Sequence, residues 1–332
     1  MRERITLLAL GMLMFALSMP LLAFSATFPE EGKVIRFIIP YGPGGGMDLY
    51  PRTLQPFLKK HLPRKSGEVV MENIAGAESV TGSREIFFSK PDGYTLGIIQ
   101  TRAVLFPQLL GQVVKFDLTK YTFLGQFNNF PTNLITWTKH AFLKSVPDVR
   151  KVPRTFTYAM SAASDIGTQW MMKEKMKLNV KPIFGFKSSR ESQLAILKGE
   201  VDTATMEYSS FASLYRSGDI KPLFHFGDRL VKFAPEIPSL KDMGYEEFAG
   251  KLTVDRTLVG PPNIPEDRVL ILRKAIWEAL NDPKFVELNE KGERYLDVQN
   301  GEKAREISVG IVNFWTKFGE EIKKEMVESG YR

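Results

Sequence analysis

The repeated alternation of short apolar segments, polar loops and helix-forming segments constrains the fold more than any other feature of this sequence. Residues 33–39 (KVIRFII) are rich in β-branched side chains and stop at Pro40, which predicts a largely buried strand. The glycine-rich segment 41–48 follows, and residues 49–61 predict a helix with Asp48 as its N-cap. Alternation of this kind is typical of α/β domains with parallel sheets.

The same order of elements recurs along the chain. Segments with strand composition are 67–72, 95–99, 156–160, 181–184, 201–206 and 258–262. Segments with helix signals are 80–88, 168–177, 191–198 and one that begins near Pro265. We also expect Pro56 to kink or shorten the first helix.

The length of the chain predicts two lobes, because 332 residues exceed one comfortable hydrophobic core. We expect residues 26–128 plus 248–332 to form the first lobe and residues 129–247 to form the second. Short crossings near Asn128 and Phe248 would join them.

The N-terminus has the layout of an export signal. Residues 1–4 carry two arginines, residues 5–24 are almost uninterruptedly apolar, and small residues stand where a cleavage after Ser25 requires them. A retained membrane anchor is the alternative, but helix-weakening residues near the end of the apolar stretch favour removal. We expect a soluble protein in the periplasm or another extracytoplasmic space, with residues 1–25 removed.

The composition excludes several classes of protein. The chain has no cysteine, which excludes disulfides, a thiol nucleophile, a thiolate metal site and a lipid-modified cysteine. Its net charge of +7 is spread along the chain and does not form a basic block, so we expect no nucleic-acid partner. Three widely separated histidines and the absence of a nucleophile-elbow motif predict no metal site, no cofactor and no catalytic residue.

The glycine-rich loop is the strongest candidate for a binding site. Gly44, Gly45 and Gly46 lie between a predicted strand and a predicted helix, where backbone N–H groups and the helix dipole favour a carboxylate or a phosphate. The glycine spacing does not match a nucleotide-binding fingerprint. A tight turn that binds nothing is the alternative.

A second loop holds the equivalent place after the strand predicted at 156–160. Ser161, Ser164, Asp165 and Thr168 can supply hydroxyl and backbone donors to the same ligand, or they can simply cap the next helix. Ligands of open α/β sheets lie beyond the carboxyl ends of the strands, which favours such loops as one site.

The remaining candidates come from other loops and from aromatic residues. Arg102 is a candidate to pair with a ligand carboxylate, with a surface arginine as the alternative. We expect one or two members of an aromatic cluster to touch the ligand and the rest to be core: Phe127, Phe130, Phe184, Phe186 and Tyr208. The complete set of candidate ligand-binding residues is Tyr41, Pro43, Gly44, Gly45, Gly46, Asp48, Glu78, Thr101, Arg102, Ser161, Ser164, Asp165, Thr168, Phe186 and Tyr208.

Several short stretches follow one another in a specific order. They are 38–48 (IIPYGPGGGMD), Glu72-Asn73 with Gly76-Ala77, 91–96 (PDGYTL), 197–202 (LKGEVD), and 235–240 (PEIPSL) with Gly244-Tyr245. Together they resemble the solute receptors of tripartite tricarboxylate transporters, also called Bug proteins. The similarity covers essentially the whole chain after the export signal.

This resemblance implies a periplasmic-binding-protein fold of type II, in which two α/β lobes joined by hinge strands close over a ligand. In the family, a ligand carboxylate is held between two loops, partly through ordered water; the corresponding residues here are 43–48 and 161–168. The implied role is capture of a small carboxylate and its delivery to membrane transporter subunits. We expect a monomer.

The chain departs from the family pattern in these loops. Family members often carry a Gly-Ser/Thr-x-x-His-like pattern in the second loop, whereas residues 164–169 (SDIGTQ) lack histidine and add Asp165. Glu78 stands where glycine is common, and Arg102 stands where a small or polar residue is usual. These changes favour a different carboxylate, or a ligand with its own polar or cationic feature.

Two other functions stay open on the sequence alone. The protein could present its ligand to a membrane sensor kinase instead of a transporter. It could also be an exported hydrolase or isomerase that acts on a carboxylate, with Asp48 as a general base; such an enzyme would turn its ligand over.

Overall fold

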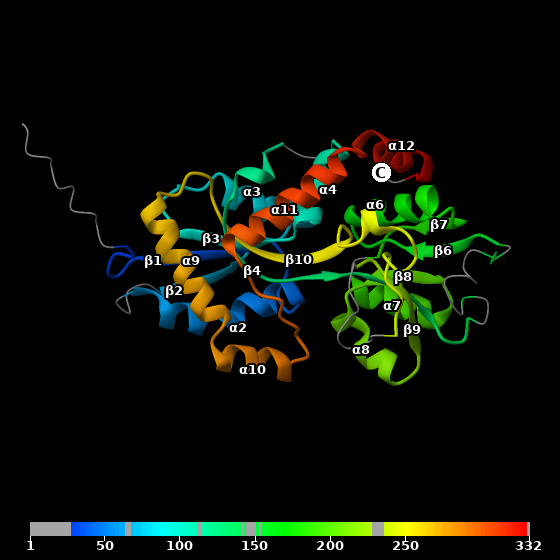
Figure 1. Cartoon of the computed structure of the whole chain (residues 1–332), viewed down its shortest axis with the longest axis horizontal. Coiled ribbons are helices and arrows are strands. Elements are labelled where there is room, and N and C mark those ends of the chain that lie inside the picture. Colours follow the sequence, from blue (N-terminus) through cyan, green and yellow to red (C-terminus); the bar gives the residue numbers. More distant parts are fainter. Residues whose placement is uncertain are drawn as a thin grey trace, which may run out of the picture.

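Two mixed β-sheets organise the chain, and helices pack around them (Figure 1). This computed structural model describes residues 28–63, 68–111, 115–140, 143, 151–152, 154–186, 188–227 and 236–330. The predicted export signal lies outside these ranges. Among the helices of the described ranges, none combines the length and the apolar character needed to cross a bilayer.

The first sheet has the strand order β11-β4-β10-β3-β1-β2. Its strands are β1 Val34–Ile39, β2 Glu68–Asn73, β3 Thr95–Ile99, β4 Thr122–Pro131, β10 Thr253–Gly260 and β11 Gln299–Asn300. β1 pairs in parallel with β2 and β3, as predicted, whereas β10 is antiparallel to β3 and β4. The sheet is therefore mixed.

The second sheet has the order β7-β6-β8-β5-β9. Its strands are β5 Asn133–Trp137, β6 Phe156–Ala159, β7 Val180–Ile183, β8 Thr203–Met206 and β9 Ile220–His225. β6 is parallel to β7 and β8, while β5 is antiparallel to β8 and β9. If the edge strand β11 is left out, the first sheet has the order β2-β1-β3-β10-β4, which corresponds strand by strand to β7-β6-β8-β5-β9. The antiparallel strands β10 and β5 hold the same place in the two sheets.

The two antiparallel inserts arise where the chain passes from one sheet to the other. β4 of the first sheet continues through Thr132 directly into β5 of the second, and β10 returns to the first sheet after β9. Figure 1 shows β10 running between two lobes that lie side by side. Each crossing strand therefore places residues at the junction of the lobes.

Ten helices and four short helical turns are described. The helices are α2 Gly46–His61, α3 Val80–Phe87, α4 Thr101–Leu109, α6 Ser164–Trp170, α7 Ser189–Lys198, α8 Tyr208–Arg216, α9 Glu266–Leu280, α10 Pro283–Lys291, α11 Gly301–Thr316 and α12 Gly319–Ser329. The turns are the 3-10 segments η2 Ala77–Ser79, η3 Leu118–Lys120 and η5 Glu246–Phe248, and the π-helical segment η4 Met171–Lys175. The last of these continues α6.

Local chemistry explains where several helices begin and end. The Ser188 side chain accepts a hydrogen bond from the Glu191 N–H at the start of α7, and Gly199 ends that helix with a φ of 74°. Asp282 caps α10 in the same way by accepting from Lys284 N–H. Serine and aspartate are favoured at the N-cap of a helix, and glycine is favoured at its C-terminal end.

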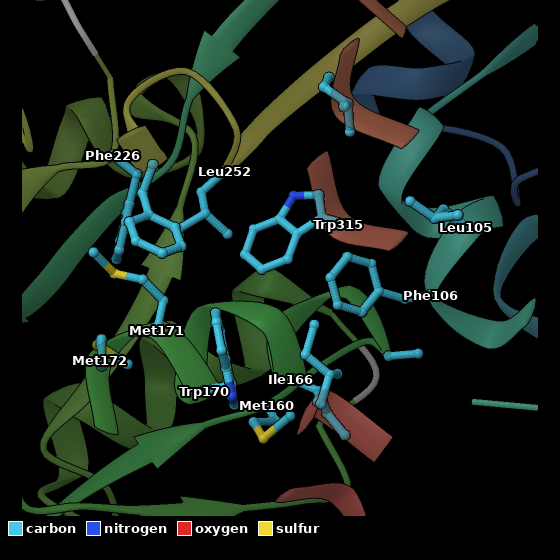
Figure 2. Packing of buried hydrophobic residues seen from close by; sticks show 14 of the residues in the cluster. Leu105, Phe106, Met160, Ile166, Trp170, Met171, Met172, Phe226, Leu252 and Trp315 are labelled. Atoms are coloured by element: carbon cyan, nitrogen blue, oxygen red, sulfur yellow. The ribbon is translucent and has the colours of Figure 1, made fainter. Parts of the chain in front are cut away.

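The hydrophobic core has three clusters, and one of them belongs to both lobes. One cluster packs the first sheet against α2 and α9, and another packs the second sheet against α7 and α8. The third joins Phe106 of α4 and Trp315 of α11 to Ile166 and Trp170 of α6, as Figure 2 shows. The ring centroids of Phe106 and Trp315 are 5.3 Å apart, and those of Trp170 and Trp315 are 6.2 Å apart. This shared cluster fixes one side of the junction between the lobes.

The last helix crosses to the second lobe. Glu325 of α12 is 4% exposed and accepts hydrogen bonds from Gln169 Nε2 and Lys173 Nζ, each at 2.7 Å. Both donors lie on α6 or its continuation. The C-terminal segment therefore contacts both lobes.

Three helix predictions need correction. α2 begins at Gly46 with Gly45 as N-cap, so Asp48 is not the cap, and Pro56 does not shorten the helix because its buried face packs into the core. α6 begins at Ser164 and not at Thr168, since the small residues and the acid of this segment suit a first helical turn. Arg102, which we expected in a loop, lies in the first turn of α4.

Candidate functional site

The loop after β1 is closed by a carboxylate of its own helix. Gly44 N–H donates to Asp48 Oδ2 at 2.9 Å, while Arg52 Nε and Asn73 Nδ2 each donate to Asp48 Oδ1 at 2.8 Å. Burial works against ionisation, but the hydrogen bonds from Gly44, Asn73 and Arg52 outweigh it and lower the pKa of Asp48. Pro43, Gly44 and Gly45 stay exposed. Asp48 thus shapes the loop, and its engaged carboxylate does not suit a general base.

The loop after β6 is closed in the same manner. Ser161 N–H and Ala162 N–H donate to Asp165 Oδ2 at 2.8 and 3.1 Å, and Ser161 Oγ donates to the same oxygen at 3.2 Å. Burial raises the pKa of Asp165, although these hydrogen bonds and the nearby charge of Arg102 oppose the shift. Ser164 and Thr168 are buried in the first turns of α6.

Glu78 reaches from the first lobe to this second loop. Ala163 N–H donates to Glu78 Oε2 at 2.5 Å. Ala77, Glu78 and Ser79 have φ angles of 42°, 53° and 84°, a conformation that residues other than glycine rarely adopt. This unusual backbone directs a carboxylate of η2 to the other lobe.

Thr101 and Arg102 begin α4 in fully buried positions. Asp255 of β10 accepts from Thr101 N–H at 2.9 Å and from Thr101 Oγ1 at 2.6 Å, and burial raises the pKa of Asp255. Arg102 is 1% exposed; its Nε donates to Thr253 O at 3.1 Å and its Nη1 to Ser164 O at 3.2 Å. Arg102 is therefore not a surface arginine, and these two donors link backbone carbonyls across the lobes.

A buried ion pair at this junction was not predicted from the sequence. Arg256 of β10 donates from Nη2 to Glu207 Oε2 at 2.7 Å, and both side chains are 6% exposed. Arg256 Nη1 donates to Asn128 Oδ1 at 3.1 Å, and its guanidinium carbon lies 4.5 Å from the centre of the Tyr50 ring. Burial opposes the charge, but Glu207 and Tyr50 outweigh it and raise the pKa of Arg256. Glu207 directly precedes α8, so the ion pair joins the two lobes.

A sequence signal for this contact exists. Asp255 and Arg256 are adjacent charges inside an otherwise uncharged strand (TVDRTLVG). Successive side chains of a strand point to opposite faces, so one charge meets Thr101 and the other meets Glu207. Two charges in a row in a central strand indicate buried partners on both faces.

The five aromatic candidates do not form one cluster. Phe127 is fully buried in the core of the first lobe, and Phe184 packs against the shared cluster. Phe186 and Tyr208 pack with the second-lobe cluster, where the Tyr208 ring lies 6.1 Å from that of Tyr295. The prediction of one cluster was wrong because these residues lie on different elements: Phe127 and Phe130 on β4, Phe184 and Phe186 after β7, and Tyr208 at the start of α8.

Tyr41 completes the set at the first loop. Tyr41 as a whole is half-buried, but its hydroxyl oxygen is fully buried, and this burial raises the pKa of the phenol. The structure thus brings Glu78, Arg102 and Ser164 together across the lobes. Among the described residues, no three histidine or acidic side chains converge in a way that could hold a metal ion.

Comparison with known proteins gives one consistent result. Residues 52–313 match the model of the tripartite tricarboxylate transporter family receptor. The protein BugT of Bordetella pertussis is 26% identical over 278 residues, which cover 79% of this chain and 80% of BugT.

Solved structures show the same fold. A TctC solute-binding protein from Polaromonas without ligand has a TM-score of 0.73 at 18% identity, covering 89% of this chain and 100% of that one. A Rhodopseudomonas palustris protein solved with adipate has a TM-score of 0.68 at 18% identity, covering 91% and 98%. These similarities confirm the predicted two-lobed binding-protein fold.

Proposed function

Since the chain belongs to the tripartite tricarboxylate transporter receptor family, we propose that it captures a small organic acid outside the cytoplasmic membrane and delivers it to the membrane subunits of such a transporter. The observation that carries this proposal is the extent of the family match, which runs from α2 to α11 and so includes both lobes. Neither a sensor kinase partner nor an enzymatic activity has an observation of its own in its favour.

The ligand site that we propose lies at the junction of the lobes and includes both loops. The Glu78 contact with Ala163 and the Arg102 contact with Ser164 bring the lobes together beside these loops. The predicted set remains our proposal for the ligand-binding residues: Tyr41, Pro43, Gly44, Gly45, Gly46, Asp48, Glu78, Thr101, Arg102, Ser161, Ser164, Asp165, Thr168, Phe186 and Tyr208. Within it, Asp48 and Asp165 shape the loops, and exposed backbone of residues 43–45 is accessible to a ligand.

The ligand class that we propose is a small carboxylate. The R. palustris protein with adipate shows that a protein of this fold can hold a dicarboxylate. The net positive charge of the chain favours the approach of anions. A ligand that bridges the two lobes would shift the population toward the closed arrangement, because it makes contacts with both only there.

The organisation of the chain is part of the proposal. We assign residues 26–128 plus 248–332 to the first lobe and 129–247 to the second, with α12 resting on α6 of the second lobe. We further propose that residues 1–25 are an export signal removed after Ser25, that the receptor acts as a monomer, and that it catalyses no reaction.

A thermal-unfolding screen tests the proposed function. The chain from Ala26 is unfolded and refolded to remove bound ligand, then heated with acetate, malate, adipate, citrate or benzoate, and with the corresponding amides as matched uncharged controls. An acid present at 100 times its Kd should stabilise the fold by about 2.7 kcal/mol. At least one acid, and not its amide, is expected to raise the Tm. Equal behaviour of every acid and its amide would contradict the proposal.

A further inference from the structure

Arg256 has an incompletely used guanidinium at the junction of the lobes. The residue is 5% exposed, Nη1 donates to Asn128 Oδ1, and Nη2 donates to Glu207 Oε2. Its Nε is buried, and no residue in the described part of the chain accepts a hydrogen bond from it. Nε and Nη2 form the edge with which arginine binds both oxygens of a carboxylate, so Glu207 occupies half of that edge.

An unpartnered donor on a buried charge is unusual, because buried polar groups in native proteins nearly always find a partner. The residues described around Arg256 do not supply an acceptor for this Nε. Nη2 lies 2.8 Å from the point where a side chain at Gly46 would begin, and the face of the guanidinium lies on the Tyr50 ring. Gly46 is the last glycine of the first loop, so the Nε–Nη2 edge of Arg256 borders the loop already proposed to bind ligand.

Glu207 belongs to the other lobe. It precedes α8, whose first residue Tyr208 is one of the proposed ligand contacts. Ser209 Oγ donates to Glu207 Oε1 at 3.0 Å, which gives the carboxylate a local partner that does not depend on Arg256. Glu207 therefore has a hydrogen-bond partner within its own lobe in addition to Arg256.

We propose that Arg256 is a specificity-determining residue that binds a carboxylate of the ligand through Nε and Nη2, and that the Glu207 carboxylate holds this place until the ligand displaces it. This inference rests on the proposed function and adds the counter-ion to it. The exchange replaces a single hydrogen bond by a paired one and gives Nε an acceptor, which none of the described residues provides.

Two substitutions with opposite expected effects test the proposal. The probe is whichever of malate, adipate, citrate and benzoate the unmodified chain binds most tightly by titration calorimetry. Arg256→Gln is expected to weaken its binding about 100-fold, because it removes the charge and the paired donors. Glu207→Gln is expected to tighten binding about tenfold, because the competing carboxylate is gone. A fixed structural ion pair would instead give weaker binding in both variants.

The control is a matched ion pair at the surface of the same junction. Arg216 Nη2 lies 2.9 Å from Glu293 Oε1, with both side chains about half exposed. Arg216→Gln is expected to leave the Kd within about twofold, since exposed pairs contribute little. If Arg256→Gln does not fold, Arg256→Lys keeps the charge without the planar pair of donors and is expected to bind about tenfold more weakly.

Each other outcome is decisive. A folded Arg256→Gln chain with unchanged Kd overturns the assignment, as does an Arg256→Lys chain that binds as well as the unmodified one. Weaker binding in Glu207→Gln would show that Glu207 supports the site and is not displaced. If the unmodified chain binds none of the acids, the proposed function itself fails, and the role of Arg256 falls with it.

Discussion

The loops that follow β1 and β6 occupy equivalent places in the two lobes, because both sheets follow the same strand order. In each loop an aspartate of the next helix accepts a hydrogen bond from the backbone N–H four residues earlier: Asp48 from Gly44, and Asp165 from Ser161. The other partners differ. Asp48 is bound by Arg52 and by nearby Asn73 within its own lobe, which lowers its pKa, whereas burial raises the pKa of Asp165.

The two loops also differ in which lobe contacts them. The second loop receives contacts from the first lobe, through Glu78 at Ala163 and Arg102 at Ser164. The first loop is held by residues of its own lobe and exposes its glycines. We infer that the first loop is preformed, while the arrangement of the second depends on how the lobes sit together.

The largest expected effect comes from the glycine of the second loop's helix. A Cβ on Gly167 would lie 2.3 Å from Phe106 Cζ, inside the shared core. Gly167→Ala is expected to lower the free energy of unfolding by about 1–3 kcal/mol in urea denaturation, because overpacking exceeds the gain in helix propensity. Gly310→Ala in α11 is the control, since its Cβ would meet no atom of the described residues within 4 Å. Equal stability of both variants would argue against a tight contact between the lobes.

The next effect concerns the preformed loop. Asp48→Ala leaves the donors of Gly44, Arg52 and Asn73 without their acceptor and is expected to destabilise the fold by about 1–2 kcal/mol at pH 7. Because the folded pKa of Asp48 is lowered, its contribution is present above about pH 4 and is lost as the pH falls further. Thermal unfolding of Asp48→Ala and of the unmodified chain, at pH 7 and below pH 4, measures this contribution and its loss in acid. A stability difference between the two chains that persists undiminished in acid would contradict this role.

Gly46→Ala separates binding from stability. The three atoms nearest to its Cβ would all belong to the end of the Arg256 side chain, which can move, so the stability loss is expected to stay below about 1 kcal/mol. The displaced guanidinium should nevertheless weaken carboxylate binding about tenfold by calorimetry. Unchanged affinity would show that the Gly46 side of Arg256 is not used by the ligand.

The smallest expected effect is a change in how the free energy of unfolding depends on pH. Since burial raises the folded pKa of Asp165, the folded chain loses stability as the pH rises from about 4 through that pKa. Asp165→Asn keeps an acceptor for the N–H groups and removes this loss, so it should be more favourable relative to the unmodified chain at pH 7 than at pH 4. Urea denaturation at the two pH values gives the comparison. The opposite trend would mean that Asp165, like Asp48, is stabilised as an anion.

Much of the fold could be predicted from local patterns. The strands at 34–39 and 95–99 and the helix at 80–87 follow from composition and turn residues, and the order of short motifs indicated the two-lobed architecture. Helix starts were less predictable. A run of small residues before Asp165 suits a loop and a first helical turn equally well, and only the contacts across the lobes distinguish them.

The candidate site was less predictable than the fold, because the contacts of its residues depend on which side chains are buried between the lobes. Arg102 has no local feature that distinguishes it from a surface arginine, and only its position at the start of α4 places it between the lobes. The left-handed φ of Glu78 offers a physical reason why glycine would suit this position. Arg256 and Glu207 are 49 positions apart in the chain, so no local pattern pairs them.

Amide hydrogen exchange with and without a saturating acid tests most directly whether the two loops face one ligand. We predict that segments 41–48 and 161–168 both gain protection, with the same dependence on acid concentration, because each lobe supplies one loop to one site. Protection of only one segment, or of neither at saturation, would contradict the account.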